Sequence, residues 1–191
     1  MDATLVRARS GDQAALRELY EAHRGRVLRL AFAVLGDADE AEDVMQDVMV
    51  YALTHLDSYD PDKAAFGTWL HTITISRSRD RLRRQRVRLS RLASLWRNSD
   101  GRAPDPAEGV TALDASSVLR AGLGSLTATQ REALALRFLE EMSFEEMGQV
   151  LGVPMRTAQA RVNSATLALR RSLERSAPPA ARPEPVEVKS G

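Results

Sequence analysis

Apolar residues return every three or four positions through most of this chain, and this spacing constrains the fold more than any other feature. The spacing holds over residues 16–34, with Asp12 as N-cap and Gly36 as stop, and again over residues 41–56, after Asp37. Such a period places the apolar side chains on one face of a helix. Aromatic residues make up only 5% of the chain, which disfavours an all-β sandwich of this length. The sequence therefore predicts an all-α fold.

A third helix is predicted from Phe66, which faces the core together with Trp69, Leu70 and Ile73. Its continuation over residues 77–88 is rich in arginine and has too few apolar positions to be packed along its whole length. We expect that part to extend into solvent or against a ligand.

The clearest domain boundary is an acidic segment with Gly and Pro that starts at Asn98. It predicts two small helical domains, residues 1–97 and 112–175, joined by a flexible acidic linker at 98–111. The Pro-rich tail, residues 176–191, is expected to be disordered.

The second domain carries two capping boxes, which begin at Thr127 and Ser143. The first predicts a helix with Ala133, Leu134, Leu136 and Phe138 on its apolar side. The second predicts a short helix that Gly152 and Pro154 interrupt, before a longer helix runs from Met155 to about Glu174. A short helix, a tight turn and a longer helix over residues 144–163 indicate a helix-turn-helix.

The polar face of the longer helix carries side chains that can read base edges. Arginine forks onto guanine, and glutamine or asparagine onto adenine. An ordinary helical hairpin with a solvated polar face would show the same spacing, so this pattern alone leaves DNA binding open. The candidate residues are Arg156, Thr157, Gln159, Arg161 and Asn163.

Charge is strongly segregated along the first domain. Residues 1–70 carry 13 acidic and 7 basic side chains, whereas residues 71–97 carry nine arginines and one aspartate. This contrast indicates two different partners, one of them a polyanion. Arginines at helical spacing, such as Arg77, Arg81 and Arg84, can bind phosphates along one face, although a solvated helix end would look alike. Tyr59, in a polar turn, is expected to be the aromatic side chain most free to stack on an unpaired base.

The polar face of the second predicted helix is acidic. A single exposed face does not converge as a metal cage does, so we favour a docking surface for a basic partner over a metal site, with a plain solvated face as the alternative. The residues of this face are Asp39, Glu40, Glu42, Asp43, Gln46 and Asp47.

Enzyme chemistry finds little support in this sequence. Cysteine is absent, and no catalytic triad spacing, phosphate loop or dinucleotide fingerprint occurs. His23, His55 and His71 are scattered, and His23 is expected to be a core histidine. We therefore expect no catalysis, cofactor, metal or small-molecule substrate. No apolar run approaches the roughly 20 residues of a membrane span, and the N-terminus lacks a signal-peptide pattern, so a cytoplasmic protein without membrane insertion is expected.

Taken together, these segments resemble an extracytoplasmic-function (ECF) sigma factor of the sigma-70 family. The resemblance covers about residues 5–175, and the order and spacing of its blocks make it specific. Those blocks are residues 15–20, 35–48, 66–70, 80–84, 126–132 and 142–154.

The resemblance implies that the acidic face docks on the clamp helices of core RNA polymerase and that the helix-turn-helix reads the −35 promoter element. It also implies that the turn at 56–63 captures an unpaired base of the −10 element and that the linker threads toward the RNA exit path. Promoter DNA and an anti-sigma factor are the other implied partners. The residues implied at −10 are Ser58, Tyr59, Ser76, Arg77, Asp80, Arg81, Arg83 and Arg84.

The sequence departs from the family pattern at Met49, Leu53, Ile75 and Ser76, and its recognition helix is poor in basic residues. Fewer phosphate contacts imply weak or unusual −35 binding. Three alternatives stay open: a dimeric helix-turn-helix regulator acting alone, a sigma mimic that sequesters an anti-sigma factor, and, more remotely, a metal-dependent hydrolase.

Overall fold

The computed structural model describes residues 3–97 and 122–176, and within these ranges every regular element is helical. This confirms the predicted all-α class. The predicted linker at 98–111 and the tail beyond Ser176 lie outside the described residues. The elements are α1 (Ala3–Arg9), α2 (Gln13–Leu35), α3 (Ala38–Thr54), the short 3-10 helix η1 (Leu56–Ser58), α4 (Phe66–Arg97), α6 (Ala128–Leu134), the π-helical η2 (Ala135–Leu139), α7 (Phe144–Leu151) and α8 (Met155–Ser176).

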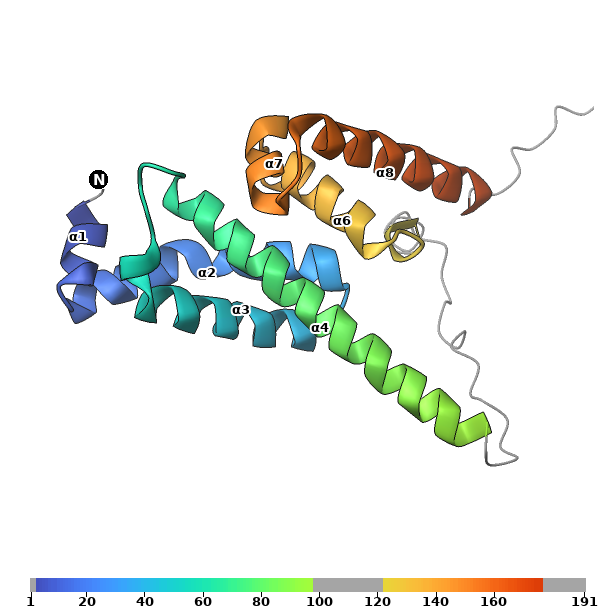
Figure 1. Ribbon diagram of the computed structural model, residues 1–191, viewed down its shortest axis with the longest axis horizontal. Helices are drawn as coiled ribbons and strands as arrows, with labels where there is room; N and C mark the ends of the chain where they lie inside the picture. The colour runs from blue at the N-terminus through green and yellow to red at the C-terminus, as the bar shows by residue number, and fades with distance from the viewer. Residues whose placement is uncertain (1–2, 98–121, 177–191) are drawn as a thin grey trace, which may run out of the picture.

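The first module is built from α2, α3 and α4, which pack side by side (Figure 1). The predicted helix ends are present, because Asp12 accepts hydrogen bonds from the backbone of the first turn of α2 and Gly36 ends that helix in the left-handed conformation. Phe66 is buried as predicted, in a core that includes Leu19, Val48 and Leu70. The sequence did not reveal α1, since seven residues are too few for a periodic signal.

The arginine-rich part of α4 runs on beyond the module, as the sequence predicted. The helix spans 32 residues, and Figure 1 shows its C-terminal half projecting away from the other helices. Residues 83–90 are exposed. The basic end of α4 is therefore open to a ligand.

The second module comprises α6, η2, α7 and α8. It forms both predicted capping boxes, at Thr127 and at Ser143. The predicted apolar position of Phe138 is wrong, because this side chain is 65% exposed. Residues 135–139 form a π-helix, whose wider turn shifts the following residues relative to the α-helical period. As a result Glu140, and not Phe138, points into the protein.

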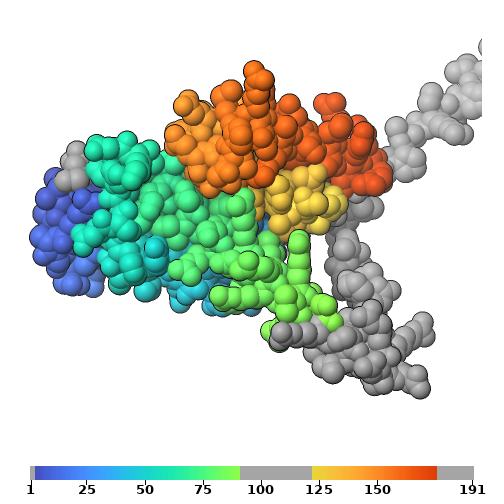
Figure 2. Space-filling model, in the orientation of Figure 1, coloured from blue at the N-terminus to red at the C-terminus, as the bar shows by residue number. Residues whose placement is uncertain are grey.

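The two modules pack against each other through a shared apolar core. Leu30 of α2 and Ile75 of α4 lie in one buried cluster with Leu136 and Met147 of the second module. Figures 1 and 2 show the second module lying along α4, where α7 makes the contact. The apolar patterns do not indicate this arrangement, because they also fit two separate modules.

Two buried carboxylates of the second module complete this interface. Glu140 Oε2 receives hydrogen bonds from Arg26 Nη2 at 2.9 Å and lies 3.1 Å from His71 Nε2. Glu132 accepts a two-pronged hydrogen bond from Arg79, at 2.9 and 2.7 Å. Each acid belongs to one module and its cations to the other, so the closed arrangement neutralises both buried charges.

Acid is expected to loosen this contact. Burial raises the pKa of Glu140, but the hydrogen bonds and charges of His71 and Arg26 outweigh burial and leave that pKa below its ordinary value of 4.5. A lowered pKa means that the stabilisation is complete above the ordinary value and is lost as the pH falls through the lowered one. The radius of gyration from small-angle scattering should stay constant from pH 7 to about 5 and rise in stronger acid. A rise already between pH 7 and 6 would assign the transition to another group.

Candidate functional site

The acidic face predicted on α3 exists and is open to solvent. Ala41, Val44 and Val48 face the core, and the opposite side carries the predicted polar residues. One of them, Glu40, is half-buried and leans toward α4. The exposed members are Asp39, Glu42, Asp43, Gln46 and Asp47. Because these side chains point outward from one helix, they suit a basic protein surface and do not converge on an ion.

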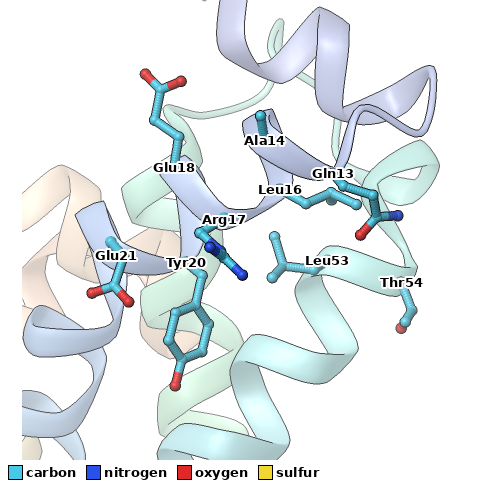
Figure 3. Close-up of a pocket in the computed structure, with 9 residues that line it drawn as sticks. All are labelled: Gln13, Ala14, Leu16, Arg17, Glu18, Tyr20, Glu21, Leu53 and Thr54. Carbon is cyan, nitrogen blue, oxygen red and sulfur yellow. The ribbon is translucent and has the colours of Figure 1, made fainter.

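Apolar groups border this acidic face. Phe32 of α2 and Val50 of α3 are large, exposed apolar side chains. Beyond them an open groove of about 1130 Å³ lies between α2 and the C-terminal end of α3 (Figure 3). Leu16 and Leu53 line it, together with charged side chains of α2. The surface thus combines charge with exposed apolar area, as protein docking surfaces do.

The turn between α3 and α4 differs from its prediction at Tyr59. This side chain is only 6% exposed, packs edge-on against Phe66 and donates a hydrogen bond to the Ala64 carbonyl at 3.0 Å. The expectation that Tyr59 is free to stack on a base is therefore wrong, since the core had room for its ring. Ser58, the neighbouring candidate, is exposed.

Several arginines of α4 have partners within the protein. Arg79 is held by Glu132, whose hydrogen bond raises the pKa of the guanidinium. Arg83 pairs with Asp80 of the same helix at 2.9 Å. Ser76 and Arg84, also predicted at the −10 element, are exposed.

Arg81 connects the two surfaces that the sequence assigned to different partners. Its Nε donates to Glu40, and its Nη2 lies 2.7 Å from Asp43 Oδ2. Charge that is segregated along the chain is therefore brought together in space at this residue. The two faces meet because α3 and α4 pack together.

An aromatic stack that the sequence analysis missed lies at the end of α3. Tyr51 and His55 stack with their ring centroids 4.3 Å apart, and the Arg77 guanidinium lies 5.2 Å from the centre of the Tyr51 ring. The four-residue spacing of Tyr51 and His55 on a helix could have indicated it. The stack positions Arg77, a predicted −10 residue, beside an aromatic face.

The predicted helix-turn-helix is present, with α7 as its first helix and α8 as its second. Ala158, Val162 and Ala165 are buried on one side of α8. On the other side Arg156, Thr157, Gln159 and Asn163 are exposed, and Arg161 is half-exposed. The structure therefore brings all five predicted −35 residues to an accessible helix face.

The turn of this motif depends on Gly148. A Cβ at this position would lie 2.8 Å from the Val153 carbonyl oxygen. The turn can therefore pass this close to α7 only because Gly148 has no side chain. Gly148→Ala is expected to destabilise the second module by about 1–3 kcal/mol through overpacking. Thermal unfolding measures this, with Gly124→Ala as control because a Cβ there meets nothing within 4 Å. Equal melting temperatures for the two variants would contradict the prediction.

Residues 3–97 and 122–176 hold neither a cluster of metal ligands nor a membrane-spanning helix. No group of three or more His, Cys, Asp or Glu side chains in these ranges could hold a metal ion. None of the described helices has the length and apolar character to cross a bilayer. His23, predicted as a core histidine, is partly buried and contacts the Phe66 ring edge-on.

Comparison with known proteins agrees with this geometry. Residues 19–88 match Sigma-70 region 2, and residues 122–171 match Sigma-70, region 4. The ECF RNA polymerase sigma factor SigW of Bacillus subtilis is 27% identical over 179 residues, which are 88% of this chain and 94% of SigW. The ECF RNA polymerase sigma factor SigE of Mycolicibacterium smegmatis is 33% identical over 171 residues, 87% of this chain and 66% of SigE.

Two solved structures are similar over most of the chain. CnrH in complex with the cytosolic domain of CnrY has a TM-score of 0.64 at 27% identity, covering 91% of this chain and 97% of CnrH. The sigma factor RpoE, in complex with the anti-sigma factor NepR from Bartonella quintana, has a TM-score of 0.61 at 26% identity, covering 83% and 96%. The chain therefore belongs to the sigma-70 family and is an ECF sigma factor.

Proposed function

We propose that this protein binds core RNA polymerase through the acidic face of α3 and directs it to promoters held by α4 and α8. The basic helix α4, with the turn before it, takes the −10 element, and the exposed face of α8 takes the −35 element. The protein itself catalyses nothing, and the polymerase makes the phosphodiester bonds. Since the polymerase is its partner, we place the protein in the cytoplasm.

The observation that carries this proposal is the division of exposed charge among three helices. α3 presents carboxylates, whereas the far end of α4 and the outer face of α8 present arginine and amide side chains. Carboxylates suit a basic protein surface, and arginine with amides suits phosphates and base edges. A dimeric regulator acting alone would have no use for the acidic face.

Transcription in vitro tests the proposal directly. Purified protein and core polymerase are supplied with genomic fragments, and start sites are mapped. We expect start sites that core enzyme alone does not use. A sigma mimic would bind an anti-sigma factor but give no transcript, and a regulator acting alone would bind DNA without polymerase. Absence of new start sites on every fragment would refute the proposal.

Promoter opening in this scheme needs no nucleotide hydrolysis. Taking a base out of the stack costs about a few kcal/mol, which contacts to the extruded base and to phosphates can offset. We infer that Ser58 in the exposed turn and exposed arginines of α4 such as Arg84 supply such contacts.

Arg156 is the residue of α8 for which we expect the largest effect at −35. It is exposed and lies in the first turn of the helix, the part that meets base edges in helix-turn-helix proteins. Arg156→Ala should weaken use of a −35-dependent promoter by the roughly 1–3 kcal/mol of one bidentate base contact. The measurement is run-off transcription from matched and mutated −35 sequences. Arg175→Ala, at the far end of α8, is the control, and equal loss in both variants would argue against base reading by Arg156.

An anti-sigma factor is the third proposed partner. Support comes from the sigma factor RpoE, which was solved in complex with the anti-sigma factor NepR. Such a partner would have to cover the surfaces that contact polymerase or DNA.

A further inference from the structure

We propose that Arg81 couples polymerase docking to promoter binding, because it is held by carboxylates of the docking face until the polymerase takes them. This inference rests on the proposed function. It adds a role for an α4 residue whose two charge partners both belong to α3.

The Arg81 guanidinium reaches across from α4 and pairs with Glu40 and Asp43, which lie on adjacent turns near the start of α3. Asp43 belongs to the exposed acidic face, and Glu40 borders it. In the free protein the same pairing therefore removes two carboxylates from the docking face and one cation from the DNA-binding helix.

Water reaches both ion pairs of Arg81. The side chains of Arg81, Glu40 and Asp43 are 35%, 29% and 60% exposed. Ion pairs of this kind contribute little net stability. The side chains of such pairs can exchange their partners for groups of another molecule at a small cost in free energy. The contact between Arg79 and Glu132 differs, because the Glu132 carboxylate is buried.

Release of Arg81 links polymerase docking to DNA binding. A basic polymerase surface that takes Glu40 and Asp43 releases Arg81, which can then bind a phosphate of the opened −10 strand. Coupling free energies are reciprocal, so DNA that binds Arg81 must strengthen polymerase docking by the same factor. The affinity for promoter DNA is therefore higher in the complex with polymerase than in the free protein.

Arg81→Ala tests the coupling. Without Arg81 the two carboxylates are free in advance, and we expect the affinity for core polymerase in the absence of DNA to rise about three- to tenfold, from the strength of exposed ion pairs. A merely structural role for Arg81 predicts the opposite sign, since loosening α3 from α4 would weaken docking. Circular dichroism establishes that the variant keeps its helix content.

Arg175→Ala is the matched control. It removes the same charge from an exposed arginine at the end of α8, outside the docking face and the −10 and −35 candidates, and Arg175 makes no ion pair among the described residues. We expect its polymerase affinity to equal that of the unmodified protein. Equal gains in Arg81→Ala and Arg175→Ala would reduce the effect to general charge and overturn the inference.

The second measurement determines the affinity for core polymerase again, now in the presence of a premelted template on which the unmodified protein initiates transcription. The template should strengthen polymerase docking of the unmodified protein and of Arg175→Ala by the same factor. It should strengthen docking of Arg81→Ala several-fold less. Arg81→Lys should retain part of the coupling because it keeps the charge. If Arg81→Ala binds polymerase no better than the unmodified protein, the inference is wrong. If the unmodified protein itself does not bind polymerase, the proposed function fails, and the inference fails with it.

Discussion

Replacing Glu42 and Asp47 of α3 with arginine is expected to abolish capture of core RNA polymerase while leaving the fold intact. Both carboxylates are exposed, and neither forms an ion pair within residues 3–97 and 122–176. The double variant changes the charge of the docking face by four units without removing an internal contact. Repulsion from a basic partner should then lower the affinity at least tenfold, since juxtaposed like charges cost several kcal/mol.

Pull-down and a quantitative binding titration measure this loss. Glu145→Arg with Glu174→Arg makes the same charge change with two exposed carboxylates of the second module and serves as the control. Choosing Glu42 and Asp47 avoids Asp43, which pairs with Arg81, so a loss of binding reports on docking alone. Full capture of polymerase by the α3 variant would remove the acidic face from the docking site.

Replacing Glu132 and Glu140 together with alanine is expected to separate the two modules. The Glu140 and Glu132 side chains are 1% and 2% exposed, and each neutralises cations of the other module. Removing one partner of a buried pair leaves uncompensated charge at the interface. The loss should be about 2 kcal/mol per pair, because Arg26 and Arg79 are already half-exposed and can rehydrate. His71 is buried, and its Nε2 would lose the Glu140 contact.

Small-angle scattering should show a larger radius of gyration for this double variant, with unchanged helix content by circular dichroism. Glu145→Ala, an exposed carboxylate of α7, is the control. The double variant Arg79→Glu with Glu132→Arg exchanges the two charges. Its radius of gyration should be closer to that of the unmodified protein than the radius of either single variant. An unchanged radius in the double alanine variant would mean that the shared apolar core alone holds the modules together.

Helix positions and ends were predictable because they depend on residues close in sequence. Asp12 and Ser143 accept hydrogen bonds from the backbone two or three residues further on, and Gly36 takes the left-handed conformation that glycine favours. The exposure of Asp47 on α3 and Arg156 on α8 also follows from helical period, since their apolar counterparts face the core.

The wrong predictions concern features that the periodic pattern of apolar residues does not encode. Tyr59 was expected to be free because it lies in a polar turn, yet its ring packs against Phe66 seven residues later. Phe138 was expected to be buried because the α-helical period places it there, and the π-helix alters that period. Neither the available space nor the extra-wide turn leaves a signal in the local pattern.

The sequence by itself determined the helices, their caps, the helix-turn-helix and the segregation of charge onto α3, α4 and α8. Each of these is set by interactions that span one or two helical turns. Only the tertiary structure decided that the modules share a core, that Glu132 and Glu140 are buried against Arg79, Arg26 and His71, and that Arg81 joins the acidic face to the basic helix. Partners separated by some 40 to 115 residues meet through packing, and a surface carboxylate and a buried one look identical in the sequence.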